Sequence, residues 1–160
     1  MKIKFGTFNL FQFVEPPFSW YVKKDSFSQE KWEEKTTWIK NQITKMDCDI
    51  IGFQEVFSQS ALKDIVFDLG FKYFETVETP KTKEGNEKVY ISTTVAVASK
   101  FPITEILNVE PNITSIKKHN FKGFFKFSRV PIKAKITLPN EQNILVYVCH
   151  LKYNWQNEFE

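Results

Sequence analysis

A stripe of mostly apolar side chains between residues 29 and 46 is the feature that most constrains how this chain can fold. Its members recur at intervals of four, three, four and three residues: Trp32, Thr36, Ile39, Ile43 and Met46. That spacing keeps all of them on one face of an α-helix. Ser26 or Ser28 can cap the start of this helix, and Asp47-Cys48-Asp49 ends it. The pattern predicts an amphipathic helix whose apolar face packs against another layer.

The segments around this helix predict an alternation of strands and helices. Residues 2–10 alternate between polar and apolar side chains, and Ile50–Phe53 is a short apolar run, so we expect a strand in each. A second apolar stripe predicts a helix over residues 59–69, and Gly70 follows it in the position where helices commonly end. The order strand, helix, strand, helix favours helices packed outside a sheet.

The second half of the chain reads as a series of strands joined by short turns. The expected strands are Phe71–Val77, 91–98, 103–109, Phe125–Leu138 and Ile144–Leu151. Residues 78–89 are polar and are expected to form a hairpin-like loop, and the polar, basic residues 111–122 are expected to be a loop or a frayed edge. Ile144–Leu151 is apolar on both faces, which predicts a central strand. Antiparallel meanders therefore complete an α/β fold.

Composition limits the class of protein only broadly. A length of 160 residues corresponds to one domain or less, and a net charge of +3 permits phosphate-rich partners without arguing for them. No run approaches the roughly 18 apolar residues that a membrane span needs, and the N-terminus lacks the apolar region of a signal peptide. We therefore expect a cytoplasmic protein. Cys48 and Cys149 are far apart in sequence and are expected to be buried free thiols.

Three polar side chains stand at the ends of expected strands: Asn9, Glu55 and His150. Ligand sites gather at such ends, where a side chain leaves the sheet but is still anchored by it. If the three strands are neighbours, the amide, the carboxylate and the imidazole meet at one edge of the sheet. Each of these groups is of a kind that metal-assisted phosphate chemistry uses.

Glu55 is the most informative of the three. A carboxylate directly after an apolar run is costly to bury without a cation or a hydrogen-bond donor. Its hard oxygen atoms suit Mg²⁺ or Mn²⁺. The alternative is a strand-end glutamate exposed to water. By strict alternation Gln54 is expected on the opposite face, in a structural hydrogen bond.

The other candidates are ambiguous when taken singly. His150 can contact phosphate or move protons, and a hydrogen-bonded core histidine is equally compatible with its position. Arg129 can hold a phosphate with two hydrogen bonds, or form a salt bridge at the rim. Asn9 taken alone is an ordinary residue for a strand end.

Five stretches together resemble the endonuclease/exonuclease/phosphatase superfamily, the DNase I-like Mg²⁺-dependent phosphoesterases. They occur in that family's order at residues 5–9, 49–56, 95–103, 127–132 and 146–152. The most specific stretch is 49–56, Asp-Ile-Ile-Gly-Phe-Gln-Glu-Val. The other four are weak singly, and the resemblance spans nearly the whole chain.

The resemblance implies a four-layer α/β sandwich of two mixed sheets flanked by helices. It implies that Glu55 is a ligand of Mg²⁺ or Mn²⁺, with Asn9 in the same metal and phosphate site. His150 would contact the scissile phosphate or assist proton transfer, and Arg129 would help to hold the substrate. The expected reaction is hydrolysis of phosphodiester bonds, most simply in DNA or RNA. Sphingomyelin-like lipids and inositol phosphates are alternative substrates, and a non-catalytic binding module is an alternative of another class.

Two motifs of that family are not found after His150. They are a Gly-Asp-x-Asn motif and a terminal Ser-Asp-His motif, and this sequence contains no aspartate after Asp68. We therefore expect residues 1–160 to be the N-terminal part of a single domain of this type. Half of the site would then be present, the missing C-terminal portion would be its natural partner, and the 160 residues alone would be inactive.

Overall fold

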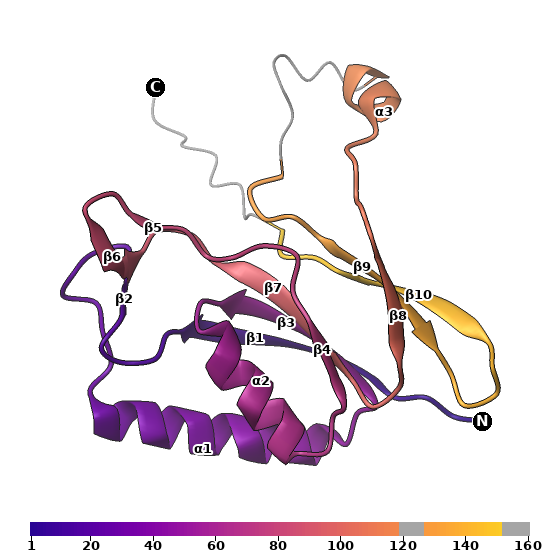
Figure 1. Cartoon of the computed structure of the whole chain (residues 1–160), viewed down its shortest axis with the longest axis horizontal. Helices are drawn as coiled ribbons and strands as arrows, with labels where there is room; N and C mark the ends of the chain where they lie inside the picture. Colours follow the sequence, from indigo (N-terminus) through magenta and orange to yellow (C-terminus); the bar gives the residue numbers. More distant parts are fainter. Residues whose placement is uncertain (119–126, 152–160) are drawn as a thin grey trace, which may run out of the picture.

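The computed structural model describes residues 1–118 and 127–151, which form sheets with the two longer helices on one side (Figure 1). The largest sheet has four strands in the order β1-β3-β7-β4. These are β1 (Phe5–Phe13), β3 (Ile50–Val56), β7 (Thr94–Ser99) and β4 (Tyr73–Glu75). β1 runs parallel to β3, whereas β7 is antiparallel to both β3 and β4. The sheet is therefore mixed.

Two further sheets complete the strands. An antiparallel meander has the order β10-β9-β8 and consists of β8 (Ile103–Leu107), β9 (Ile132–Thr137) and β10 (Asn143–Val148). A small sheet joins β2 (Ser19–Trp20), β6 (Asn86–Tyr90) and β5 (Thr82–Lys83).

The first helix, α1 (Gln29–Met46), has the predicted bounds, because its ends are set by local signals. The Ser28 hydroxyl accepts a hydrogen bond from the Lys31 amide at 3.3 Å and so caps the helix. At the other end Asp47 adopts a left-handed conformation with φ of 46°. The remaining helices are α2 (Gln59–Asp68) and α3 (Ile113–Lys118).

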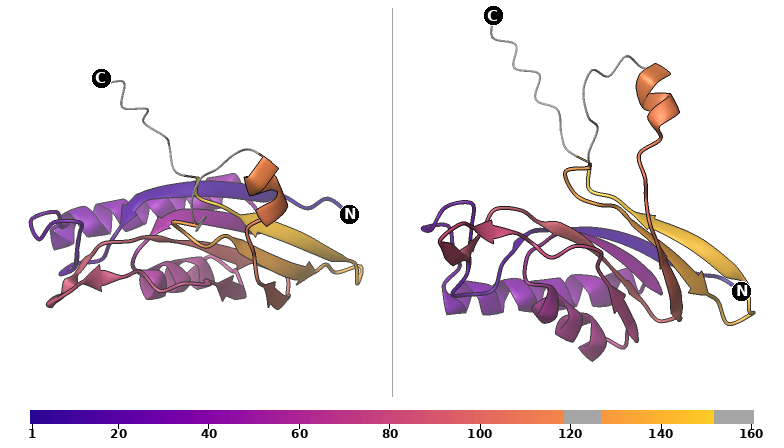
Figure 2. Two further views of the ribbon diagram at one scale, coloured as in Figure 1. Left: turned by 90° about the horizontal axis from the view of Figure 1, so that it is seen from above. Right: turned by 45° about the horizontal axis from the view of Figure 1, so that its top comes forward.

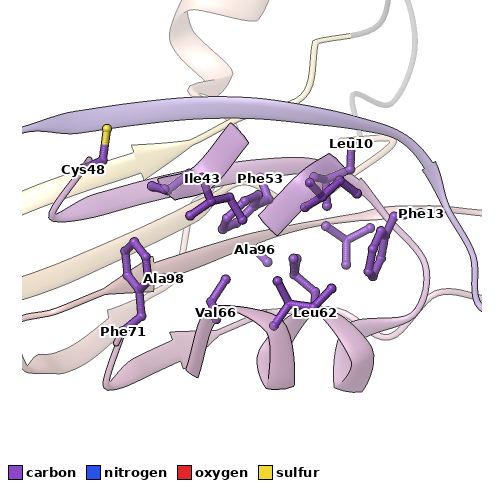
Figure 3. Packing of buried hydrophobic residues seen from close by; sticks show 14 of the residues in the cluster. Leu10, Phe13, Ile43, Cys48, Phe53, Leu62, Val66, Phe71, Ala96 and Ala98 are labelled. Atoms are coloured by element: carbon purple, nitrogen blue, oxygen red, sulfur yellow. The ribbon is translucent and has the colours of Figure 1, made fainter. Parts of the chain in front are cut away.

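Helices α1 and α2 cover one face of the four-stranded sheet, and Figure 3 shows the apolar core between them. The predicted stripe contributes Trp32, Ile39 and Ile43, all buried. Phe53 of β3 meets them from the sheet. Removing this apolar surface from water is the main stabilising contribution of this layer pair.

The antiparallel meander β10-β9-β8 packs on the face of the four-stranded sheet that the helices leave open. Val95 and Val97 of β7 lie against Ile132 and Ala134 of β9 in a second apolar core. The right-hand view of Figure 2 shows β9 and β10 on the far side of the sheet from α1. The described residues thus form a helix layer, a sheet and a second sheet, and the fold is mixed α/β.

The hairpin expected at residues 78–89 is present but is built from two short strands, and the loop or frayed edge expected at 111–122 contains a helix. Residues 78–89 contain β5 and most of β6, which pair as a hairpin around Gly85 with φ of 72°. Their polar side chains concealed strands because the small sheet leaves most of them exposed. The segment expected as a loop at 111–122 forms α3 over Ile113–Lys118, and residues 119–122 lie outside the described part.

The predictions for β10 and its neighbour Cys149 are wrong. Within the described residues β10 pairs only with β9, so it is an edge strand and not a central one. Leu145 and Tyr147 lie on the outer face with 52% and 55% of their surface exposed. Cys149 is exposed, whereas Cys48 is buried as expected, and both are free thiols. Similarly, Phe127–Pro131 precede β9 and are not part of the strand predicted to begin at Phe125, which is outside the described part.

None of the helices in the described part of the chain has both the length and the apolar character that spanning a bilayer requires.

Candidate functional site

The structure brings Asn9, Glu55 and His150 together, although only Glu55 and His150 stand near the ends of their strands, β3 and β10. β1 continues to Phe13, so the expectation that Asn9 ends its strand is wrong: Asn9 lies in the middle of β1. The Asn9 side-chain amide donates a hydrogen bond to Glu55 Oε1 at 3.1 Å. His150 Nε2 lies 3.9 Å from the same oxygen atom. The Glu55 side chain is 23% exposed and that of His150 is 17% exposed, so the contact is partly shielded from solvent. The three groups therefore meet, but not at one edge of a single sheet as expected, because β10 belongs to the second sheet and not to that of β1 and β3.

An irregularity in β3 turns Glu55 toward this site. Phe53 pairs with Ala96 and Val56 pairs with Thr94, so Gln54 and Glu55 together face one residue of β7. Phe53 and Val56 both pack on the helix side. Gln54 and Glu55 consequently share the side that faces β10, which is the geometry of a β-bulge.

The expectation that Gln54 and Glu55 point to opposite faces is therefore wrong, since strict alternation fails at the bulge. Gln54 does make a side-chain hydrogen bond: its Nε2 donates to Thr7 Oγ1 at 3.1 Å. Thr7 and Gln54 line a cavity of about 320 Å³ that lies between β1, β3 and β10 beside the site.

A second bulge lies directly opposite, in β1. Asn9 pairs with Gln54 and Phe13 pairs with Val56, so the three residues between Asn9 and Phe13 face Glu55 alone. Within this bulge the Gln12 amide donates to Glu55 Oε2 at 2.9 Å, and the Phe11 amide donates to Asn9 Oδ1 at 2.9 Å. Each carboxylate oxygen of Glu55 thus accepts one hydrogen bond from the bulged segment.

The backbone at this point is left-handed. Phe11, Gln12 and Glu55 have φ of 49°, 58° and 59°, three of the six non-glycine residues with positive φ in the described part of the chain. The left-handed conformation costs about 1–2 kcal/mol for a residue with a side chain. Such strain gathers at functional sites, where the surrounding structure holds it in place.

His150 and Arg129 bring unsatisfied nitrogen atoms to the site. His150 Nδ1 and Arg129 Nε are buried and have no hydrogen-bond partner within residues 1–118 and 127–151. Burial lowers the pKa of His150, the Arg129 guanidinium lowers it further, and Glu55 acts in the opposite direction. At pH 7 the imidazole is therefore neutral, and its contact with Glu55 is not an ion pair. The Val130 amide donates to Glu78 Oε2 at 2.7 Å, which holds the backbone beside Arg129.

The residues present can contribute to a divalent metal site but do not enclose one. A carboxylate has about four lone-pair positions, and Glu55 uses two of them in the hydrogen bonds described above. The Asn9 amide oxygen is occupied by the Phe11 amide, which leaves one lone pair. In the described part of the chain no three His, Cys, Asp or Glu side chains are close enough to hold a metal ion together.

Comparisons with known proteins identify no relative. No protein-family model matches the chain, and no curated protein matches its sequence. The description of the site therefore rests on the sequence and the geometry.

Two contributors to the site were missed by sequence reasoning. The Gln12 amide could not be foreseen, because no sequence signal announces a left-handed Phe-Gln pair. Lys35 of α1, whose ammonium donates a hydrogen bond to the Phe11 carbonyl at 2.8 Å, could not be singled out in the sequence, because most charged residues of this helix are exposed. Gly52 did carry a signal, since a glycine inside a strand often marks a close approach of another segment. A Cβ atom at Gly52 would lie 2.9 Å from both Val148 methyl groups.

Proposed function

We propose that this chain carries part of the site of a Mg²⁺-dependent phosphoesterase of the endonuclease/exonuclease/phosphatase type, acting on phosphodiester bonds. The observation that carries the proposal is the meeting of Asn9, Glu55 and His150, drawn from positions far apart in the sequence, around a bulged carboxylate. The helix, sheet, sheet arrangement is compatible with part of a four-layer sandwich, which we include in the proposal.

Glu55 would hold the metal, with Asn9 beside it. The bulges support this role because they fix the carboxylate from two sides, through the Asn9 side chain and the Gln12 amide. Bound there, Mg²⁺ would neutralise charge on phosphoryl oxygen atoms and lower the pKa of a coordinated water molecule.

The remaining residues suit a phosphate group. The Arg129 guanidinium has a buried Nε–H without a partner in the described residues, and phosphate oxygen atoms readily accept hydrogen bonds from such a donor. The neutral imidazole of His150 can donate a hydrogen bond through one nitrogen and accept a proton through the other. A proton acceptor thus lies beside the Glu55 carboxylate, with the Arg129 guanidinium close enough to His150 to affect its charge.

A Mn²⁺ titration of the 160-residue chain tests the proposal without requiring turnover. We expect binding that Glu55→Gln weakens by at least about tenfold, since even the loss of partners around a metal ligand costs 10–100-fold. Glu75→Gln is the matched control, because Glu75 is an exposed strand glutamate far from the site. Equal Mn²⁺ affinity in wild type and Glu55→Gln, or no binding at all, would refute the proposal and leave the non-catalytic binding module as the better description.

The substrate is tested separately. Single-stranded DNA, RNA, sphingomyelin and inositol polyphosphates would be compared as competitors of a phosphodiester probe bound in the presence of Mn²⁺. A nuclease predicts that the nucleic acids compete most strongly. A lipid substrate could use the aromatic side chains of Phe18 and Trp20 in the loop after Pro16-Pro17. The structure offers little support for this role, because Phe18 stacks on Tyr90 and Trp20 packs on Phe27. Both rings are used in packing within the protein.

A further inference from the structure

A lysine from the helix layer reaches the strained turn of the site. The Lys35 ammonium donates a hydrogen bond to the Phe11 carbonyl oxygen at 2.8 Å, although Lys35 belongs to α1 and Phe11 to β1. This is the turn whose next residue, Gln12, donates its amide to Glu55. The lysine and the carboxylate are therefore connected through a single peptide unit.

Aromatic rings fix the direction of the ammonium group. Lys35 Nζ lies 5.7 Å from the centre of the Phe11 ring and 5.2 Å from that of Phe27. Phe27 is in turn packed against Trp20 and Trp32, with ring centres 4.9 Å and 6.5 Å apart. A cation over two ring faces is attracted by both, so the ammonium is held where it meets the carbonyl.

The geometry requires such a support. Phe11 and Gln12 are both left-handed, and neither residue type favours that conformation. The turn persists only if its surroundings over-determine it. In the described part of the chain the contacts that do so are Asn9 with the Phe11 amide, Glu55 with the Gln12 amide, and Lys35 with the Phe11 carbonyl. Of these three side chains, only Lys35 belongs to another layer of the fold.

We propose that Lys35 is a positioning residue for the site: by holding the Phe11 carbonyl it fixes the left-handed turn from which the Gln12 amide binds and orients Glu55. The inference depends on the proposed function only in treating Glu55 as the working carboxylate. The Glu55 carboxylate attracts the Lys35 ammonium through its charge, but the hydrogen bond of Lys35 goes to the Phe11 carbonyl, so the positioning role is separate from that of a counter-ion.

The test measures the hydrogen-exchange rate of the Gln12 amide in the metal-free wild-type chain and compares it with the rate in three lysine variants. Lys35→Met keeps most of the side-chain length and removes the donor, whereas Lys35→Arg keeps a cationic donor. Lys31→Met is the control, since Lys31 is exposed on the same helix. The exchange rate of Gln12 is divided by that of Phe53, a buried residue of β3, so that a general loss of stability cancels. We expect Lys35→Met to raise this ratio at least about tenfold, as for a lost hydrogen bond to a charged group, and Lys35→Arg to restore most of it.

A Mn²⁺ titration of the same variants shows whether loss of the Lys35 ammonium weakens or strengthens metal binding. Loss of positioning predicts that Lys35→Met weakens Mn²⁺ binding about tenfold, comparable to the loss of other partners that orient a metal ligand. A lysine that acts only through its charge predicts the opposite, since removing a cation near Glu55 favours binding of another cation. Tighter binding in Lys35→Met would therefore overturn the inference.

The two proposals fail in distinguishable ways. An unchanged exchange ratio in Lys35→Met shows that Lys35 does not position the turn, whatever the site does. A raised ratio in a chain that never binds Mn²⁺ removes the proposed function and leaves the control of Glu55 by Lys35 in place.

Discussion

Gly52 of β3 lies directly against Val148 of β10, where the two sheets pack on each other beside the site. A Cβ atom at Gly52 would lie 2.9 Å from Cγ1 and from Cγ2 of Val148, closer than real carbon contacts allow. Glu55 follows Gly52 by three residues and His150 follows Val148 by two. The missing side chain of Gly52 therefore helps to set the distance at which the carboxylate and the imidazole face one another.

Substituting Gly52 by alanine is expected to destabilise the fold by about 1–3 kcal/mol, the usual cost of overpacking a core. Urea unfolding of Gly52→Ala measures this loss. The double variant Gly52→Ala/Val148→Ala removes the methyl groups that the new Cβ meets, so it should be less destabilised than the sum of the two single variants. Simple additivity would contradict the close contact.

Replacing Phe11 by glycine is expected to stabilise the protein by about 0.5–1 kcal/mol. Glycine adopts the left-handed conformation without the cost of about 1–2 kcal/mol that Phe11 bears. Loss of the contact between the Lys35 ammonium and the Phe11 ring removes about 0.5–1 kcal/mol of that gain, and the Phe11 side chain, 67% exposed, loses little burial. Thermal unfolding provides the measurement. Phe5→Gly in the same strand is the control, because Phe5 is also exposed but has ordinary strand backbone, and there glycine should destabilise.

His150 should make the stability of the metal-free chain depend on pH. Burial and Arg129 lower its pKa below the ordinary value of 6.5, so the unfolded chain binds a proton at a pH where the folded chain does not. Stability therefore falls as the pH drops below about 6.5, until the folded-state pKa is reached. Urea unfolding at steps of about 0.5 pH unit between about pH 7.5 and 5 measures the free energy of unfolding. This free energy should fall with pH in wild type and fall less in His150→Gln.

The other histidine of the chain, His119, lies outside the described residues and provides the comparison. His119→Gln should retain the part of this pH dependence that His150 causes. If His150→Gln and wild type lose stability equally on acidification, the imidazole is not protected from protonation in the fold.

Asn9 is expected to act on metal binding through Glu55. Asn9→Ala removes the donor to Glu55 Oε1 and the acceptor of the Phe11 amide. If Glu55 holds a metal ion, Mn²⁺ affinity should fall about 10–100-fold, as for other partners of a ligand. Calorimetry measures the affinity, with Asn41→Ala on the exposed face of α1 as control. An unaltered affinity in Asn9→Ala would show that the hydrogen bond does not orient the carboxylate.

The parts of the fold that depend on nearby residues could be predicted from the sequence. The bounds of α1 are as expected because its apolar stripe, the Ser28 cap and the left-handed Asp47 all lie within the segment itself. α2 ends within a residue of its expected bound, next to Gly70 with φ of 89°. The meeting of Asn9, Glu55 and His150 was expected, but the way they meet was not, since Asn9 lies within β1 and His150 follows a strand of the second sheet.

The features that depend on distant neighbours could not be predicted. β10 has the apolar composition of a central strand, and only its pairing shows that it is an edge. The two bulges that bring Glu55 to the side of β10 arise where β1, β3 and β7 lose register with one another. Lys35 resembles every other lysine of α1 in sequence, and its role follows only from the position of Phe11.

The three groups of the site come from positions 9, 55 and 150, and this wide separation has a consequence for folding. Helix α1 can form early from local contacts, whereas pairing β1 with β3 and docking β10 each require the closure of a long loop. The Asn9–Glu55–His150 cluster is thus assembled only in molecules whose sheets have already joined. Any ligand that needs all three groups would bind the native state alone, so it would report on completed folding and raise the midpoint of thermal unfolding with its concentration.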